Sequence, residues 1–150
     1  MTECFFNKDF IVLDLEAESA FDVIKYGSKL LYDAGYVKET YCQSVIDREL
    51  VAPTGLPTDG LFVAMPHTFG EHVLKEGAVL IRVKEPVIFK SMEDGETDLP
   101  VKIVTLLAFN NGESQMKHLM ELMRLFQNKE LLIKVNEANT ADEVHALLNS

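Results

Sequence analysis

The chain of 150 residues, 47% hydrophobic and 25% charged, is long enough for one domain with a hydrophobic core. No apolar run approaches the roughly 20 residues of a membrane helix, Met1–Asp9 does not fit a secretory signal peptide, and the net charge of −10 argues against nucleic-acid binding. Its two cysteines, Cys4 and Cys42, are too few for a disulfide framework or a zinc site, which fits a reducing cytoplasm. We expect a single cytoplasmic domain over residues 1–150.

A strand followed by two helices is predicted in the first third of the chain. Phe10–Leu13 is a short apolar run typical of a buried strand. Ser19 and Asp22 have the spacing of a capping box ahead of a helix that Gly35 ends. The apolar stripe of this helix consists of Phe21, Val23, Ile24, Leu30, Leu31 and Ala34. A second helix is predicted over Thr40–Leu50, with its buried face formed by Val45, Ile46 and Leu50.

Strands and loops alternate in the middle of the chain. Pro53–Gly60 is rich in turn-forming residues and predicts a loop, after which the apolar run Leu61–Met65 ends at Pro66, His67 and Thr68. Val79, Ile81 and Val83 alternate with charged residues, which predicts a half-buried strand.

The next segments complete the predicted sheet. Pro86–Phe89 predicts a separate short strand at an edge, because proline cannot donate a ladder hydrogen bond. Ser91–Pro100 is polar and acidic and predicts a loop. Val101–Phe109 is the most apolar candidate and is expected to be the central strand.

The last third is predicted to be mainly helical. A helix over Ser114–Gln127 is expected to bury Met116, Leu119, Met120, Met123 and Phe126, and we favour core packing over a methionine-lined binding groove. Leu131–Val135 predicts a further short element. Thr140 and Glu143 form a second capping box before Val144, Leu147 and Leu148. Together the elements predict a layered α/β domain with a mixed sheet.

Among the four histidines, His67 has the most unusual setting. Pro66 restricts the chain before it, and side chains at strand ends of α/β sheets tend to face a ligand crevice. If Phe69–Val73 forms a helical turn, its first N–H groups would hold an anion beside the imidazole, with the Thr68 hydroxyl nearby. These features suit a phosphorylated histidine, although a structural loop histidine is the alternative.

Metal and nucleotide chemistry have little support in the sequence. His67 and His72 would lie on different sides of a helix, and nearby Asp59 and Glu71 form no recognised ligand set, so we expect no metal site. The motifs of P-loop, dinucleotide-binding and α/β-hydrolase proteins are absent from the sequence. We therefore expect no cofactor.

A longer string of residues resembles a known signature. Arg48-Glu49 is followed by Pro53-Thr54-Gly55 and then by the apolar run Phe62–Met65 ending in Pro66-His67. This order and spacing resemble the enzyme IIA domains of the fructose/mannitol class, part of the bacterial phosphoenolpyruvate-dependent sugar phosphotransferase system. The resemblance spans nearly the whole chain and implies a three-layer α/β/α fold with a mixed β-sheet.

The resemblance also implies a phosphotransferase activity in sugar transport. His67 would accept a phosphoryl group on Nε2 from the phosphocarrier protein HPr and pass it to a cysteine of enzyme IIB, which serves the membrane component IIC. Arg48 matches the family's arginine beside that histidine. Thr54, Thr68 and Gln115 are the further candidates for lining the phosphate site.

One departure from the family pattern concerns the helix after the central strand. Many relatives carry a second active-site histidine there, and the matching position is Gln115, whereas His118 lies one turn further and receives no such role. A glutamine at this position, with Pro53-Thr54-Gly55 after the Arg-Glu pair, looks most like the galactitol subgroup. The alternatives are a regulatory relative of the nitrogen phosphotransfer branch, acting by protein binding, and a non-catalytic binding domain on the same fold.

Overall fold

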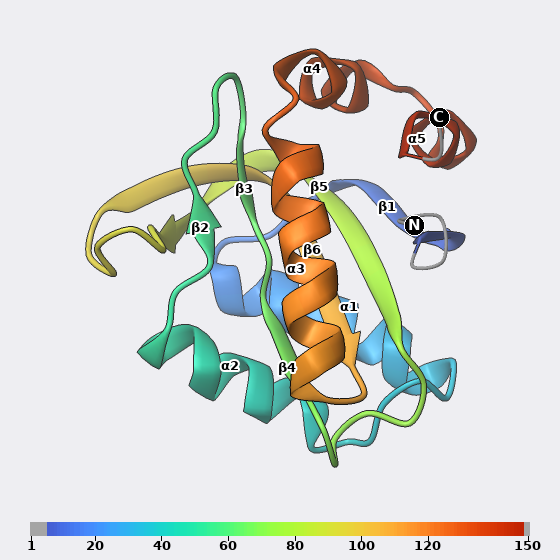
Figure 1. The fold of residues 1–150 in the computed structure, drawn as a ribbon. Helices are drawn as coiled ribbons and strands as arrows, with labels where there is room; N and C mark the ends of the chain where they lie inside the picture. The colour runs from blue at the N-terminus through green and yellow to red at the C-terminus, as the bar shows by residue number, and fades with distance from the viewer. Residues whose placement is uncertain (1–5, 149–150) are drawn as a thin grey trace.

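The computed structural model describes residues 6–148, whose strands form one mixed sheet (Figure 1). The strands are β1 (Phe6–Leu15), β2 (Gly55–Leu56), β3 (Phe62–Ala64), β4 (His67–Phe69), β5 (Gly77–Lys90) and β6 (Asp98–Phe109). Their order is β1-β5-β6-β3-β2, and β4 also pairs with β6. The β1–β5, β3–β6 and β4–β6 pairs are parallel, whereas β5–β6 and β2–β3 are antiparallel. The predicted mixed sheet, with Val101–Phe109 at its centre, is confirmed.

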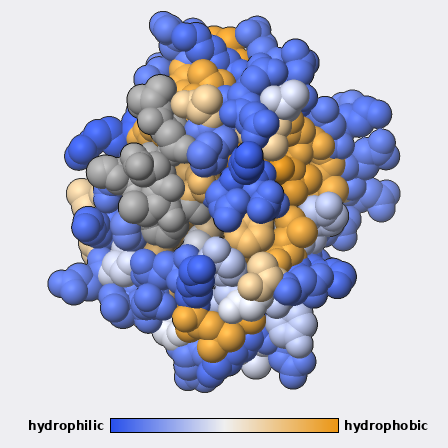
Figure 2. All heavy atoms as spheres, turned by 90° about the vertical axis from the view of Figure 1, so that its right-hand side faces the viewer, coloured by the Kyte–Doolittle hydropathy of each residue, from blue (hydrophilic) through white to orange (hydrophobic). Residues whose placement is uncertain are grey.

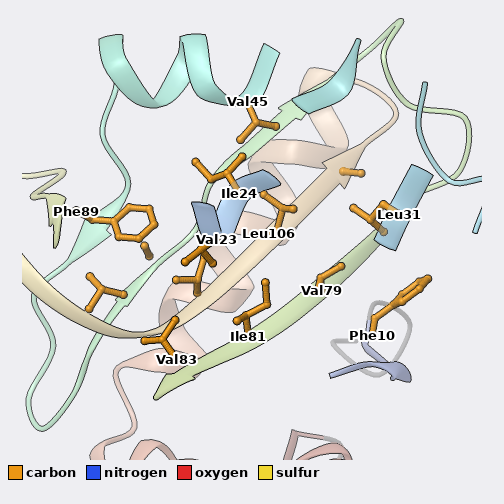
Figure 3. Close-up of a cluster of buried hydrophobic side chains, with 14 of the residues drawn as sticks. Phe10, Val23, Ile24, Leu31, Val45, Val79, Ile81, Val83, Phe89 and Leu106 are labelled. Atoms are coloured by element: carbon orange, nitrogen blue, oxygen red, sulfur yellow. The ribbon is translucent and has the colours of Figure 1, made fainter. Parts of the chain in front are cut away.

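Helices cover both faces of this sheet. The helices α1 (Ala20–Asp33) and α2 (Tyr41–Val51) pack on one face of the sheet, whereas α3 (Gly112–Phe126) packs on the other and lies in front in Figure 1. The chain ends in α4 (Lys129–Glu137) and α5 (Ala141–Leu148), which pack on the α3 side of the sheet. Each face has its own hydrophobic cluster, and Figure 3 shows the α1–α2 cluster against β5 and β6. The three-layer α/β/α architecture is confirmed.

Side-chain caps fix where several helices begin. The Ser19 hydroxyl accepts a hydrogen bond from the Asp22 N–H at 3.2 Å, and the Thr140 hydroxyl does the same for Glu143 at 3.1 Å. Both predicted capping boxes therefore start helices. Gly35, with φ of +82°, follows the end of α1 in the left-handed conformation that glycine adopts readily.

The predicted buried faces of the helices are partly wrong. Met116 and Met120 are 65% and 57% exposed, and Leu50 is 67% exposed. The residues of α3 that face the sheet are Leu119, Leu122, Met123 and Phe126. Met116 and Met120 lie beside this face and not in the contact between the helix and the sheet. Phe21 and Ala34 of the predicted α1 stripe are likewise exposed.

The strand predictions around residues 77–90 also need correction. Gly77–Val83 is buried throughout because helices cover both faces of the sheet, so it is not half-buried. Pro86 lies inside β5, at a register shift between Arg82 and Val87, and does not begin a separate strand. Elsewhere in the chain, the short element predicted over residues 131–135 is part of the helix α4, and the segment 53–60 that was predicted to be a loop contains the short strand β2.

The surface between these elements is mainly hydrophilic. Seen from the side of β1 and α5, charged and polar residues surround separate hydrophobic areas (Figure 2). Within residues 6–148 there is no helix with the length and apolar character needed to cross a membrane. Cys4 lies outside the described residues, and Cys42 on α2 is a free thiol.

Candidate active site

His67 begins a strand that follows a break in the chain. The strand β3 ends at Ala64 and β4 starts at His67, and the intervening Pro66 carbonyl still accepts a hydrogen bond from the Leu107 N–H at 2.9 Å. The helical turn considered for Phe69–Val73 does not form, because β4 runs to Phe69 and Gly70 then turns the chain with φ of +89°. No helix N-terminus therefore supplies an anion site there.

The ring of His67 is held in one orientation by the backbone. Its Nδ1 lies 2.7 Å from the carbonyl oxygen of Met65. Because a carbonyl oxygen only accepts hydrogen bonds, Nδ1 carries the proton and Nε2 keeps its lone pair. Burial lowers the pKa of His67 below 6.5, and the positive charge of Arg48 lowers it further, against the opposing effect of the Met65 hydrogen bond. His67 is therefore a neutral imidazole with an unprotonated Nε2 at neutral pH.

Arg48, in the last turn of α2, reaches the same end of the sheet. Its guanidinium carbon lies 5.3 Å from the centre of the Phe69 ring. Its Nε is buried and has no hydrogen-bond partner among the described residues. A permanently charged guanidinium with uncommitted N–H groups is suited to binding phosphoryl oxygens beside His67.

Thr54 connects α2 to the backbone that holds His67. The carboxylate of the buried Glu49 accepts hydrogen bonds from the Thr54 N–H at 2.9 Å and the Thr54 hydroxyl at 2.8 Å. The same hydroxyl accepts a hydrogen bond from the Met65 N–H at 3.2 Å. Burial raises the pKa of Glu49, and the Thr54 hydrogen bonds oppose this shift. The chain Glu49–Thr54–Met65 therefore ends at the residue whose carbonyl orients His67.

Thr68 makes a second connection between α2 and β4. It is buried, and its hydroxyl lies 2.7 Å from the Ser44 hydroxyl. Ser44 precedes Arg48 by about one turn on the same side of α2. The roles of Glu49 and Ser44 were not predicted from the sequence. The signals that could have found them are the Arg48-Glu49 pair and the position of Ser44 four residues before Arg48 on the same side of a helix.

Phe109, at the end of β6, forms the opposite wall of the site. Its ring is 6.1 Å from that of His67, at an interplanar angle of 65°. It also stacks on His118 of α3, with 6.2 Å between ring centres and an interplanar angle of 1°. His118 thus contacts the site through Phe109. Gln115, one turn earlier on α3, has a buried side-chain oxygen without a hydrogen-bond partner among the described residues.

His72, the next histidine in the chain, lies in a different environment. His72 Nδ1 is 2.8 Å from the Thr40 hydroxyl at the start of α2. The two residues line a groove of about 570 Å³ along α2, together with Ser44 and Arg48. Within the part of the chain that the structure describes, no three His, Cys, Asp or Glu residues are grouped closely enough to hold a metal ion.

The sequence has clear relatives among known proteins. Residues 4–150 match the family described as "Phosphoenolpyruvate-dependent sugar phosphotransferase system, EIIA 2". The chain is 31% identical over 147 residues to the mannitol-specific phosphotransferase enzyme IIA component of Staphylococcus aureus, which covers 96% of this chain and 94% of that protein. It is 30% identical over 141 residues to the ascorbate-specific PTS system EIIA component of Shigella boydii, which covers 93% of this chain and 88% of that protein.

A solved structure shares the arrangement of helices and strands. The complex of enzyme IIAMTL and phosphorylated enzyme IIBMTL from Escherichia coli contains a chain that aligns with a TM-score of 0.81 and 26% identity, over 96% of each chain. This coverage agrees with the family match over residues 4–150. The chain belongs to the EIIA 2 family of the phosphoenolpyruvate-dependent sugar phosphotransferase system, whose members are phosphotransferases that act through a phosphohistidine.

Proposed function

We propose that His67 is the phosphorylated residue of this enzyme IIA, accepting a phosphoryl group from HPr and passing it to a cysteine of enzyme IIB in the cytoplasm. The observation that carries the proposal is the hydrogen bond between His67 Nδ1 and the Met65 carbonyl. It leaves Nε2 as the nucleophilic ring nitrogen. The lowered pKa of His67 keeps that nitrogen unprotonated at neutral pH.

The transfer needs no metal ion and no nucleotide. The Nε2 lone pair attacks the phosphorus of the donor phosphohistidine, the new N–P bond forms, and the donor's N–P bond breaks with its electron pair returning to the donor ring. The His67 ring then carries positive charge, while Nδ1 keeps its proton and donates it in a hydrogen bond to the Met65 carbonyl. In the second step the cysteine thiolate of enzyme IIB attacks phosphorus, and the His67 Nε2 lone pair is restored.

Four further residues have roles in this proposal. Arg48 binds the equatorial phosphoryl oxygens and offsets their charge in the transition state. The amide of Gln115, whose oxygen is buried without a partner, turns its NH₂ group toward the phosphoryl group. Thr54 and Thr68 support the strand ends through Glu49, Met65 and Ser44, so we assign them no direct contact with phosphate.

The transported carbohydrate is a separate question. The position of Gln115 and the Pro53-Thr54-Gly55 turn predict galactitol, whereas the relatives compared above are specific for mannitol and ascorbate. Galactitol therefore stays a prediction. Phosphoryl transfer from the phosphorylated protein to purified enzymes IIB of the galactitol, mannitol and ascorbate systems would distinguish among the three.

Labelling tests the proposal directly. Wild type, His67→Ala and His118→Ala are incubated with phosphoenolpyruvate, enzyme I and HPr, and their intact masses are measured. We expect one phosphoryl group on wild type and on His118→Ala, none on His67→Ala, and an adduct that is labile to acid and stable to alkali. Phosphorylation of His67→Ala at the wild-type level contradicts the proposal, and phosphorylation of wild type without onward transfer to any enzyme IIB favours the regulatory alternative.

A further inference from the structure

We propose that Phe69 is a positioning residue for phosphoryl transfer: its ring face holds the Arg48 guanidinium on the side of β4 that carries His67. The inference rests on the proposed roles of His67 and Arg48. Neither the family match nor the sequence motif assigns a function to Phe69.

The alternation of side chains along β4 supplies the first argument. His67 and Phe69 are two residues apart in a strand, so their side chains project from the same face, while Thr68 projects from the other. The structure agrees, because Thr68 contacts Ser44 of α2 and His67 and Phe69 lie against residues of the α3 side. A group stacked on Phe69 is therefore placed next to the imidazole.

The Phe69 ring is itself fixed on a second side. Gly112, the first residue of α3, lies beside the ring, because a Cβ at this position would be in ordinary van der Waals contact with Phe69 Cε2 at 3.8 Å. The neighbouring Gly70 N–H donates a hydrogen bond to the Phe109 carbonyl at 3.1 Å, which anchors the strand just beyond Phe69. The ring thus lies between Arg48 of α2 and the start of α3, next to an anchored strand end.

Arg48 depends on this support because its side chain has few other attachments. The Nε atom has no hydrogen-bond partner among the described residues, and the guanidinium carbon lies 5.3 Å from the ring centre. A guanidinium that stacks its flat face on an aromatic ring keeps its in-plane N–H groups free for other partners. Those N–H groups are the ones that bind phosphoryl oxygens. An aliphatic residue at position 69 would fill the space without this attraction.

The hydroxyl pair of Ser44 and Thr68 strengthens the same arrangement from the other face. It fixes α2 to β4 about one turn before Arg48. The helix is therefore attached to both faces of one short strand, and the guanidinium position follows from the two contacts together.

Single-turnover transfer from phosphorylated HPr tests the inference in a double-mutant cycle. Wild type, Phe69→Leu, Arg48→Ala and the double variant are compared, with Phe69→Tyr as the conservative change. Tyr26→Leu on α1, where the ring is 43% exposed, is the control for the loss of an aromatic ring outside the motif. We expect Phe69→Leu to slow transfer about three- to thirtyfold, Phe69→Tyr and Tyr26→Leu to stay within about twofold, and the double variant to be no slower than Arg48→Ala.

The outcomes separate this inference from the proposed function. Normal transfer by Arg48→Ala would overturn the role of Arg48, and with it the reason for a support. A slow Arg48→Ala combined with an unaffected Phe69→Leu would overturn the positioning role alone. Phe69→Leu that slows transfer by the same factor in wild type and in Arg48→Ala would also overturn the positioning role, because it would show that the ring acts independently of Arg48. Thermal melting checks the fold of each variant, and Phe69→Met replaces Phe69→Leu if the latter does not fold.

Discussion

At the scale of single residues, the proposed chemistry depends on which ring nitrogen of His67 carries a proton and donates a hydrogen bond. The motif around Arg48 and Pro66-His67 identifies both candidate residues from the sequence. The motif does not reveal the partner of Nδ1, because that partner is a backbone carbonyl whose direction depends on the break between β3 and β4. The contact between Arg48 and Phe69 is equally hidden, since the two residues are brought together only by the packing of α2 on β4.

The lowered pKa of His67 predicts the pH dependence of phosphoryl acceptance. Protonation of Nε2 removes the nucleophile, so the rate should rise with pH through the pKa of the free protein and be constant above it. Since burial and the Arg48 charge lower this pKa, we expect the midpoint below 6.5. Arg48→Ala should move the midpoint upward, because a neighbouring positive charge is removed. The ring resonances of His67 followed by NMR give this pKa directly, and a midpoint at or above 6.5 in wild type would contradict the assignment.

At the scale of elements, the caps and the central strand were predictable, whereas the buried faces of helices were less so. Local signals such as Ser19 and Thr140 act within a few residues and need no tertiary context. The faces of α3 depend on how the helix lies on the sheet, and apolar residues at 116 and 120 fit a helical stripe without being part of the contact. The alternation in β5 was misleading because Arg82, a charged residue, is buried.

The faces of α3 can be tested by paired substitutions. Leu122 is fully buried, so Leu122→Ala should lower the free energy of unfolding by about 2–5 kcal/mol. Met120→Gln should change it by less than about 0.5 kcal/mol, because that side chain is mostly in solvent. Urea denaturation measures both variants. A Met120→Gln variant as unstable as Leu122→Ala would restore the original prediction of a buried methionine stripe.

The link between α2 and β3 predicts a distinct effect at Thr54. Thr54→Val keeps the shape of the side chain but leaves a buried Glu49 carboxylate oxygen without its hydroxyl donor. We expect a loss of about 1–3 kcal/mol in the free energy of unfolding and slower phosphorylation of His67. Thr54→Ser, which keeps the hydroxyl, is the control and should stay close to wild type in both measurements. Equal stability of the valine and serine variants would show that the Glu49–Thr54–Met65 chain contributes little.

At the scale of the whole molecule, Arg82 joins segments that are far apart in the sequence. Its guanidinium donates hydrogen bonds to the carbonyls of Val135, Asn136 and Ala138 at 3.0, 3.1 and 2.7 Å, and to Asp14 Oδ1 at 3.1 Å. The first three acceptors lie at the end of α4, where carbonyl groups lack partners within the helix. One buried side chain thus attaches the α4–α5 segment to the sheet and to β1.

Removal of Arg82 should therefore loosen one part of the molecule before the rest. Arg82→Met fills much of the space but supplies no donors. The backbone amides of α4 and α5 should therefore exchange with deuterium faster than in wild type, by more than the amides of β5 and β6 do. Lys134→Met, in the same helix but exposed, is the matched control and should leave the exchange unchanged. Uniformly faster exchange in Arg82→Met would indicate a general loss of stability and would contradict the role in attaching α4 and α5.

The central place of β6 has a consequence for the synthesis of the protein. The strand spans Asp98–Phe109 and pairs with β3, β4 and β5, all of which precede it in the chain. While the ribosome is still making the first 97 residues, β4 has no strand to pair with, even though His67 and Arg48 have already been added. The nascent chain therefore leaves the ribosome with unpaired strand edges, the kind of surface that chaperones recognise. His67 acquires the geometry of the candidate site only when a later segment of the message has been translated.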